Sequence, residues 1–367
     1  MISLMRNCDL TVKCNKRMKN STVFIVAVLC AAAAACTSYR EDMRYEPPSF
    51  SKEYTARIKP LNRETTMGNI LRMYLCDSVL LVQGKNVDND NVFHVFSIND
   101  GRYLSSFGYY GRGPNELASY YCAAQDPEGR TLHVLDTNGA YITIDIPRSI
   151  GNRRIEVISE GMASHHTTTN SIFSLPKGRL LHCEGFDCRF FSTDMQYRDT
   201  VRLHDAFPYI SPEFEADTII RKGYFSMFTM HDVKPDRTRL VCTSANGMLM
   251  EIFDIGGDSI RPVVTRRFFE PKMKNQIAPQ PDCISGSCSL KTSDKYIYLV
   301  YSDGLALDMD NTECILGIFD WSGAEVAQYR LDSNIGPFVV MPDDSRIYCW
   351  PHDEEGEEYL GYFDLEH

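Results

Sequence analysis

The chain has 367 residues, of which 43% are hydrophobic and 11% aromatic, enough apolar material for a sizeable folded core. Its formal net charge is −11, and residues 1–35 contribute five basic residues and one acidic residue, so the remainder carries about −15. Such an acidic surface repels phosphate backbones, and the charge therefore argues against nucleic acid as a partner.

Residues 1–35 are predicted to be a secretory signal peptide. Basic residues stand at positions 13, 16, 17 and 19, and an apolar run from Val23 leads into Ala31–Ala35. A charged segment, a short apolar core and small residues at a cleavage point are typical of such signals. The run is shorter than the about 20 apolar residues that span a bilayer comfortably. Translation starts at Met1 or at Met18, which stands just before this pattern.

Cys36 is the predicted site of lipid attachment. Ala33-Ala34-Ala35-Cys36 resembles the bacterial lipobox, in which the cysteine receives a lipid and becomes the mature N-terminus. A polar, extended tether is expected over residues 36–53. These features predict an outer-membrane lipoprotein on the periplasmic side or at the cell surface, with the membrane as a partner through the lipid. The alternative is a plain signal peptide followed by an unmodified cysteine.

Residues 54–367 are predicted to form an all-β domain. Short runs rich in Val, Ile, Tyr, Phe and Leu alternate with turns, as in Val92–Ile98, the turn Asn99–Gly101 and the run Arg102–Phe107. No amphipathic helix of three or more turns is expected. The runs fall into groups of about four strands, within residues 69–107, 131–145, 172–191, 224–254, 296–331 and 335–364.

These groups predict a β-propeller of six four-stranded blades. Their spacing of roughly 45–55 residues is close to that of known propeller repeats, and radial repetition protects the edges of the sheets. The strand near Tyr54–Ile58 is expected to complete the last blade and close the ring. Asp254, Asp320 and Asp364 each follow a Phe at the end of a strand, and each is expected to begin a turn by bonding backbone amides. The alternative fold is one long β-sandwich or two shorter ones.

The densest motif is the loop Phe107–Leu117, which contains three glycines and a proline. This composition predicts a structured, irregular connection from the outermost strand of one blade to the innermost strand of the next, on a face of the propeller. Its candidate site residues are Gly108, Gly111, Arg112, Gly113, Pro114, Asn115 and Glu116.

This loop resembles the FG-x-x-G-x-G-P-G-E segment of NHL-type and TolB-like six-bladed propellers, and especially that of a lipoprotein family of Bacteroidota with this fold. The segments Phe319–Gly323 and Tyr301–Gly304 resemble turns of the same family. The resemblance covers about residues 54–367 and implies a six-bladed propeller in which the loop is mainly structural, without a catalytic role. Asn115 replaces the family's usual Gly, and Asn also tolerates positive φ.

Nine cysteines follow Cys36. Cys183/Cys188 and Cys283/Cys288 have the same close spacing and can close small disulfide loops in an exported protein. The alternative, which the apolar surroundings of most other cysteines favour, is that they are free, buried thiols. No C-x-x-C pair is present, so a structural zinc site is not expected, and no cofactor is predicted.

Two functions remain open. The sequence has no G-x-S-x-G, H-E-x-x-H or P-loop motif, which favours a non-catalytic propeller that binds an envelope protein or glycan. The alternative is a metal-dependent enzyme, similar to propeller lactonases or lyases, with ligands in the central channel. Its candidate ligands stand beside glycines or turns: Glu116, Asp126, Asn246 and Asp303.

Overall fold

The computed structural model describes residues 44–366, apart from short gaps at 66, 87–89, 112, 114–115, 118–121, 136–139, 163–168, 185–188, 195–198, 206–228, 257–258, 275–277, 309–312 and 354. The predicted signal peptide and Cys36 lie outside the described residues, as do Arg112, Pro114 and Asn115 of the loop motif. The chain divides into two compact units, Met1–Glu46 and Pro47–His367, and the second contains every described strand. No helix in the described part has the length and apolar character needed to cross a bilayer.

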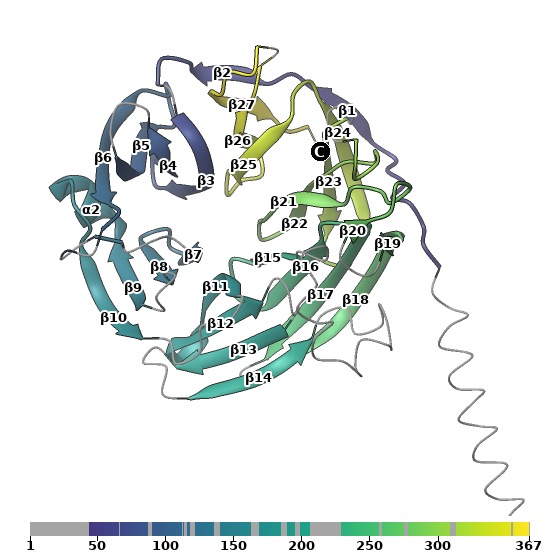
Figure 1. Cartoon of the computed structure of the whole chain (residues 1–367), viewed down its shortest axis with the longest axis horizontal. Helices are drawn as coiled ribbons and strands as arrows, with labels where there is room; N and C mark the ends of the chain where they lie inside the picture. The colour runs from purple at the N-terminus through teal and green to yellow at the C-terminus, as the bar shows by residue number, and fades with distance from the viewer. Residues whose placement is uncertain are drawn as a thin grey trace, which may run out of the picture. The chain divides into compact units, whose positions relative to one another are not determined.

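The second unit is a ring of six sheets, so the predicted six-bladed propeller is confirmed and the sandwich alternative is wrong (Figure 1). The first blade comprises β3 (Met67–Cys76), β4 (Val79–Asn86), β5 (Asn91–Ser97) and β6 (Tyr103–Tyr109). The second comprises β7 (Cys122–Gln125), β8 (Thr131–Leu135), β9 (Ala140–Asp145) and β10 (Val157–Met162). The third comprises β11 (Thr169–Leu175), β12 (Arg179–Glu184), β13 (Arg189–Asp194) and β14 (Thr200–Asp205).

The fourth blade comprises β15 (Thr229–Val233), β16 (Arg239–Ser244), β17 (Met248–Gly256) and β18 (Ser259–Phe269). The fifth comprises β21 (Ser287–Thr292), β22 (Tyr296–Tyr301), β23 (Ile315–Asp320), β24 (Glu325–Leu331) and β1 (Glu53–Ala56). The sixth comprises β25 (Ile335–Val340), β26 (Arg346–Pro351), β27 (Leu360–Asp364) and β2 (Lys59–Asn62). Outside the blades lie the pair β19 (Met273–Lys274) and β20 (Ala278–Pro279), the helix α2 (Ile146–Asn152) and the 3-10 turn η1 (Pro176–Gly178).

The ring closes through β2, one strand later than the sequence predicts. The segment expected to complete the last blade instead forms β1, which runs parallel to β24 as a fifth outer strand of the fifth blade. β2 then pairs antiparallel with β27 and completes the sixth blade. The shift occurs because the chain is held between the two blades, where Ile58 is buried and its backbone N–H donates to Asp332 Oδ1 at 3.1 Å.

The core lies between neighbouring blades rather than within any one of them. Each hydrophobic cluster draws on two adjacent blades, for example the first and second blades or the fifth and sixth. The middle strands therefore bury both faces and read as continuous apolar runs, as in β5 and β23. The outermost strand β10, by contrast, is almost wholly exposed. This packing explains the continuous apolar runs of the sequence.

Of the three aspartates expected to begin turns, only Asp320 does so. Its Oδ1 accepts from the backbone N–H of Ser322 at 2.7 Å and of Ala324 at 3.1 Å, as predicted. The prediction is wrong for the other two, which pair with arginines on neighbouring strands. Asp254 lies 3.2 Å from the Arg239 guanidinium, and Asp364 lies 2.7 Å from that of Arg346.

Three buried histidines make the stability of the propeller sensitive to acid. Burial lowers the pKa of His133 and of His182 to about 4, and that of His231 to about 3. In the unfolded chain these imidazoles titrate near about 6.5. The unfolded state therefore binds more protons below that pH, and the stability present above it is lost as the pH falls toward the folded pKa.

We therefore expect the free energy of unfolding to fall between pH 7 and pH 5, by roughly 2 kcal/mol for each of these histidines. Urea denaturation at several pH values measures this slope. A His182→Gln variant is expected to show a shallower slope, because its side chain cannot be protonated. An unchanged slope in that variant would contradict the assignment to buried histidine.

Candidate functional site: the central cavity

The innermost strands of all six blades surround a cavity in the central channel. These strands are β3, β7, β11, β15, β21 and β25, which Figure 1 shows nearest the middle of the ring. The cavity has a volume of about 480 Å³ and is lined by residues from each of them. This size lies within the range of about 300–1,000 Å³ that is usual for small-molecule sites.

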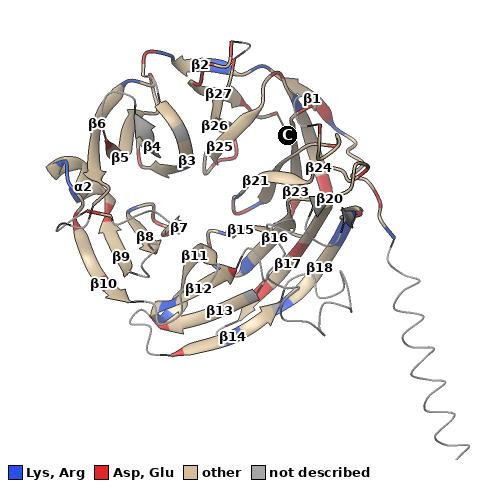
Figure 2. Cartoon of the chain, in the orientation of Figure 1, with Lys and Arg blue, Asp and Glu red and all other residues tan. Residues whose placement is uncertain are grey.

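Five charged residues line this cavity: Arg72, Asp126, Asp232, Arg237 and Lys291. They come from the first, second, fourth and fifth blades, so that only the closed ring assembles them. Figure 2 shows basic positions at the end of β21 nearest the middle of the ring. Three of the five are basic, so the cavity has an excess of positive charge although the chain as a whole is acidic.

Asp232 is held by one donor on its own strand and one on the innermost strand of the next blade. Its Oδ1 accepts from the backbone N–H of Val233 at 2.9 Å, and its Oδ2 accepts from the Thr292 hydroxyl at 3.1 Å. Burial raises the pKa of Asp232, and the nearby charge of Lys291 opposes this rise. Burial in turn lowers the pKa of Lys291, with Asp232 opposing the change. The two side chains thus stabilise each other's charged forms across the fourth and fifth blades.

Arg237 follows β15 and joins three blades at one end of the channel. Its Nη2 donates to the backbone oxygen of Gln125 at 2.9 Å, and Gln125 Nε2 donates to that of Leu75 at 2.7 Å. Arg237 Nε is buried and has no hydrogen-bond partner in the described part of the chain. The same holds for Oδ1 of Asn170, which lines the cavity from β11. A donor and an acceptor therefore stand unsatisfied at the wall of the cavity.

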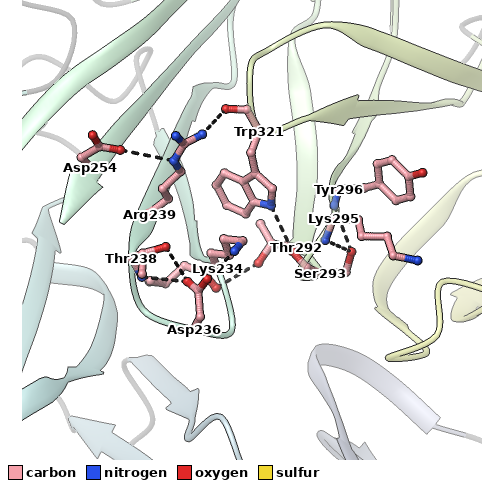
Figure 3. A network of polar contacts seen from close by, with 11 residues as sticks. Lys234, Asp236, Thr238, Arg239, Asp254, Thr292, Ser293, Lys295, Tyr296 and Trp321 are labelled. Atoms are coloured by element: carbon pink, nitrogen blue, oxygen red, sulfur yellow. Dashed lines mark hydrogen bonds and ion pairs between the residues drawn. The ribbon is translucent and has the colours of Figure 1, made fainter.

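A polar network beside the channel fixes the fourth blade to the fifth (Figure 3). The indole Nε1 of Trp321 donates to the backbone oxygen of Ser293 at 3.1 Å, and the guanidinium of Arg239 donates to the backbone oxygen of Trp321. The Thr292 hydroxyl, next to Ser293, shares its one hydrogen between Asp232 Oδ2 and the backbone oxygen of Val233, which lies 2.9 Å away. These contacts position Thr292, which holds Asp232 in the cavity.

The loop motif forms a compact structure around one carboxylate. Oε2 of Glu116 accepts from the backbone N–H of Gly113 at 2.7 Å. A Cβ at Gly111 would lie 1.9 Å from the same oxygen, so a side chain at this position would displace the Glu116 carboxylate. The N–H of Gly111 donates to the backbone oxygen of Leu117, whose side chain is buried between the first and second blades. Neither Gly111, Gly113 nor Glu116 lines the cavity.

We expect Gly111→Ala to lower the free energy of unfolding by about 1–3 kcal/mol, because the added methyl group displaces the Glu116 carboxylate and breaks its hydrogen bond. Chemical denaturation measures the change. The control is Gly151→Ala in α2, where a Cβ meets nothing within 4 Å. There alanine should stabilise the helix by about 0.5–1 kcal/mol, so equal effects at the two positions would refute the role of the loop.

The metal-ligand candidates do not gather in the channel. Asp126 alone among them lines the cavity. Because the four strands of each blade are antiparallel, the innermost strands of all blades run in the same direction along the channel. Asp126 lies in the turn after β7, and therefore at the end of the channel where the innermost strands end. Glu116, Asn246 and Asp303 lie in connections at the opposite end. Among the described residues, no group of three or more His, Cys, Asp or Glu side chains is arranged to hold a metal ion.

Of the two cysteine pairs, only Cys283/Cys288 lies wholly within the described residues, because Cys188 lies outside them. Cys183 is a free, buried thiol. Cys283 and Cys288 are also free, and their thiols donate to different backbone oxygens, those of Ile284 and Val300. The structure thus agrees with the free-thiol alternative for the second pair.

Sequence reasoning missed the charged residues of the cavity, apart from Asp126. A signal was present only for Arg72, which interrupts the largely apolar run Met67–Cys76. Asp232 and Lys291 stand in short strands of mixed polarity, and Lys291 precedes the predicted strand group 296–331. The first strand of each blade is the one that lines the channel. A charged residue in that strand therefore marks a cavity position.

The fold and the polar cavity define a six-bladed β-propeller with a polar central channel. The family model described as TolB-like 6-blade propeller-like matches residues 49–343, and the chain belongs to this family. The predicted resemblance of the chain to TolB-like six-bladed propellers is thereby confirmed. No curated protein matches the sequence.

Solved structures agree with the fold. A member of the DUF4221 family from Bacteroides vulgatus superposes with a TM-score of 0.55 at 11% identity, covering 85% of this chain and 96% of that one. The structure of U3-55K has a TM-score of 0.50 at 11% identity, with 84% and 98% covered. The WD40 repeats of RRP9 give 0.50 at 10%, with 88% and 100% covered. At such identities the likeness shows the fold alone.

Proposed function

We propose that this protein is a lipid-anchored propeller of the bacterial outer membrane that binds an envelope protein or glycan at its central cavity. The observation that carries the binding role is the cavity itself, in which charged side chains from four blades meet in a space of small-molecule size. A rigid ring holds these groups in place before a ligand arrives, which lowers the entropic cost of binding.

The anchor is tested by metabolic labelling with a palmitate analogue in a bacterial host. The wild-type chain should incorporate the label and fractionate with the outer membrane. The Cys36→Ala variant should remain unlabelled and appear in the soluble fraction. Equal labelling of both chains would refute lipidation at Cys36, and the outer-membrane assignment fails if the labelled chain stays in the inner membrane. Protease treatment of intact cells separates surface exposure from the periplasmic side.

The binding role is tested with the full chain, purified in detergent and immobilised. Envelope proteins and glycans are passed over it, and retained material is compared with that on an Asp232→Asn, Arg237→Gln double variant. Specific retention by the wild-type chain that weakens in the variant supports binding at the cavity. Equal retention by both would place any binding elsewhere, and no retention by either would count against a binding protein of this kind.

A further inference from the structure

Lys291 is a cavity cation that makes no direct ion pair among the described residues, although the nearby charge of Asp232 favours its protonated form. Of the two carboxylates, Asp232 already accepts from two donors. Within the described residues, Lys291 Nζ makes no hydrogen bond or ion pair, and it lies 6.0 Å from the centroid of the Tyr74 ring. Arg72 lies within electrostatic range of Lys291. Two cations thus line the same cavity, where Arg72 also donates to the backbone oxygen of Asn170 at 3.4 Å. An anion bound near both would be stabilised by their charges.

Two atoms of the cavity wall that lack hydrogen-bond partners restrict which kind of anion fits the cavity. Arg237 Nε is a buried donor without a partner, which suits an anionic or carbonyl oxygen. Asn170 Oδ1 is a buried acceptor without a partner, so it needs a donor such as a hydroxyl group. An inorganic phosphate dianion has only one hydroxyl donor, and Asp126 and Asp232 repel its double charge more strongly than the single charge of a carboxylate. A ligand that combines one carboxylate with several hydroxyl groups satisfies both atoms.

We propose that Lys291, Arg72 and Arg237 form a subsite for the carboxylate of a sugar acid, whose hydroxyl groups meet Asn170 and the other polar residues of the cavity wall. The cavity volume of about 480 Å³ has room for one or two such sugar units. Ser171, Ser289 and Thr292 add hydroxyl groups to the wall. This inference rests on the proposed function, because it names the ligand class of the same cavity.

Isothermal titration calorimetry on the full chain in detergent tests the subsite. The probes are glucuronate, a uronic-acid oligosaccharide, glucose and inorganic phosphate. Glucuronate should bind, whereas glucose and phosphate should bind at least tenfold more weakly. Tighter binding of the oligosaccharide would identify an acidic glycan as the source of the carboxylate, and equal binding would identify the free sugar acid.

Two variants of matched chemistry complete the test. Lys291→Gln should weaken glucuronate binding at least tenfold. Lys295→Gln removes the same charge four residues along the chain, but its side chain is 70% exposed and does not line the cavity, so it should leave binding unchanged. Far-ultraviolet circular dichroism and thermal unfolding verify that both variants fold.

The outcomes separate this inference from the proposed function. Equal binding of glucose and glucuronate, phosphate binding without glucuronate binding, or an unaffected Lys291→Gln variant would each overturn the carboxylate subsite. If none of the probes binds, the subsite is also refuted. In each of these cases the proposed function is still tested separately, by whether the immobilised chain retains an envelope protein or glycan.

Discussion

A chain that lacks residues 1–63 is expected to lose the folded propeller. This deletion removes β1 and β2, so the sixth blade loses its outer strand and the ring loses the contact between its two ends. It also removes Phe50, whose ring packs edge-on against Phe319 with centroids 5.3 Å apart. A propeller that is open at one blade exposes unpaired strand edges and the apolar surface between blades. Circular dichroism and size-exclusion chromatography should show loss of cooperative unfolding and aggregation.

A point substitution tests the closure of the ring without shortening the chain. Ile58 is 5% exposed and belongs to the cluster shared by the fifth and sixth blades. Ile58→Asp places a carboxylate there without a partner, and we expect it to cost at least about 4 kcal/mol in free energy of unfolding. Thr55→Asp adds the same charge at an exposed position of β1 and should change stability by less than about 0.5 kcal/mol. A cooperative transition of normal midpoint in the truncated chain, or similar costs for both substitutions, would show that closure does not hold the ring together.

Trp321→Ala is expected to lower the free energy of unfolding by about 3–5 kcal/mol, the usual cost of emptying a large buried aromatic site. Trp321 is 7% exposed, in the turn after β23, and packs in the cluster between the fourth and fifth blades. Its indole also donates to the backbone oxygen of Ser293, as Figure 3 shows. Both the packing and the hydrogen bond are lost in the variant.

Trp321→Phe separates these two contributions. It keeps most of the apolar volume but leaves the Ser293 oxygen without its donor, so we expect a loss of about 1–2 kcal/mol. Leu307→Ala, at a side chain that is 63% exposed, serves as the control and should change stability by less than about 0.5 kcal/mol. Circular dichroism is the better probe, because the sequence has two tryptophans and these variants remove one. Equal stability of Trp321→Ala and wild type would mean that this turn does not couple the blades.

Much of the fold was predictable because its determinants are local. A run such as Val92–Ile98 followed by Asn99–Gly101 specifies a strand and a turn through side-chain pattern and backbone preference alone. Six repeats of such units then leave few ways to bury both faces of each sheet. The closing strand was misplaced by a few residues because β1 and β2 are short, and their partners lie more than 270 positions away in the chain.

The candidate site was largely unpredictable for the same reason, because its residues lie far apart in the sequence. Arg72, Asp232 and Lys291 are separated by some tens to hundreds of positions and meet only because successive blades rotate around one axis. Asp254 and Asp364 illustrate the point on a smaller scale. Their sequence context matches that of Asp320, yet an arginine on a neighbouring strand competes successfully with the turn amides.

The sequence by itself determined that the chain forms repeated four-stranded units, that residues 107–117 form a structured, irregular loop, and that the chain resembles TolB-like propellers. Only the tertiary structure decided which residues face the channel, how the charges there balance, and which of the first two strands closes the ring. Strand and turn formation depend on neighbours in the chain, which can be read along it. A cavity depends on the packing of side chains from separate blades, which exists only once the ring has closed.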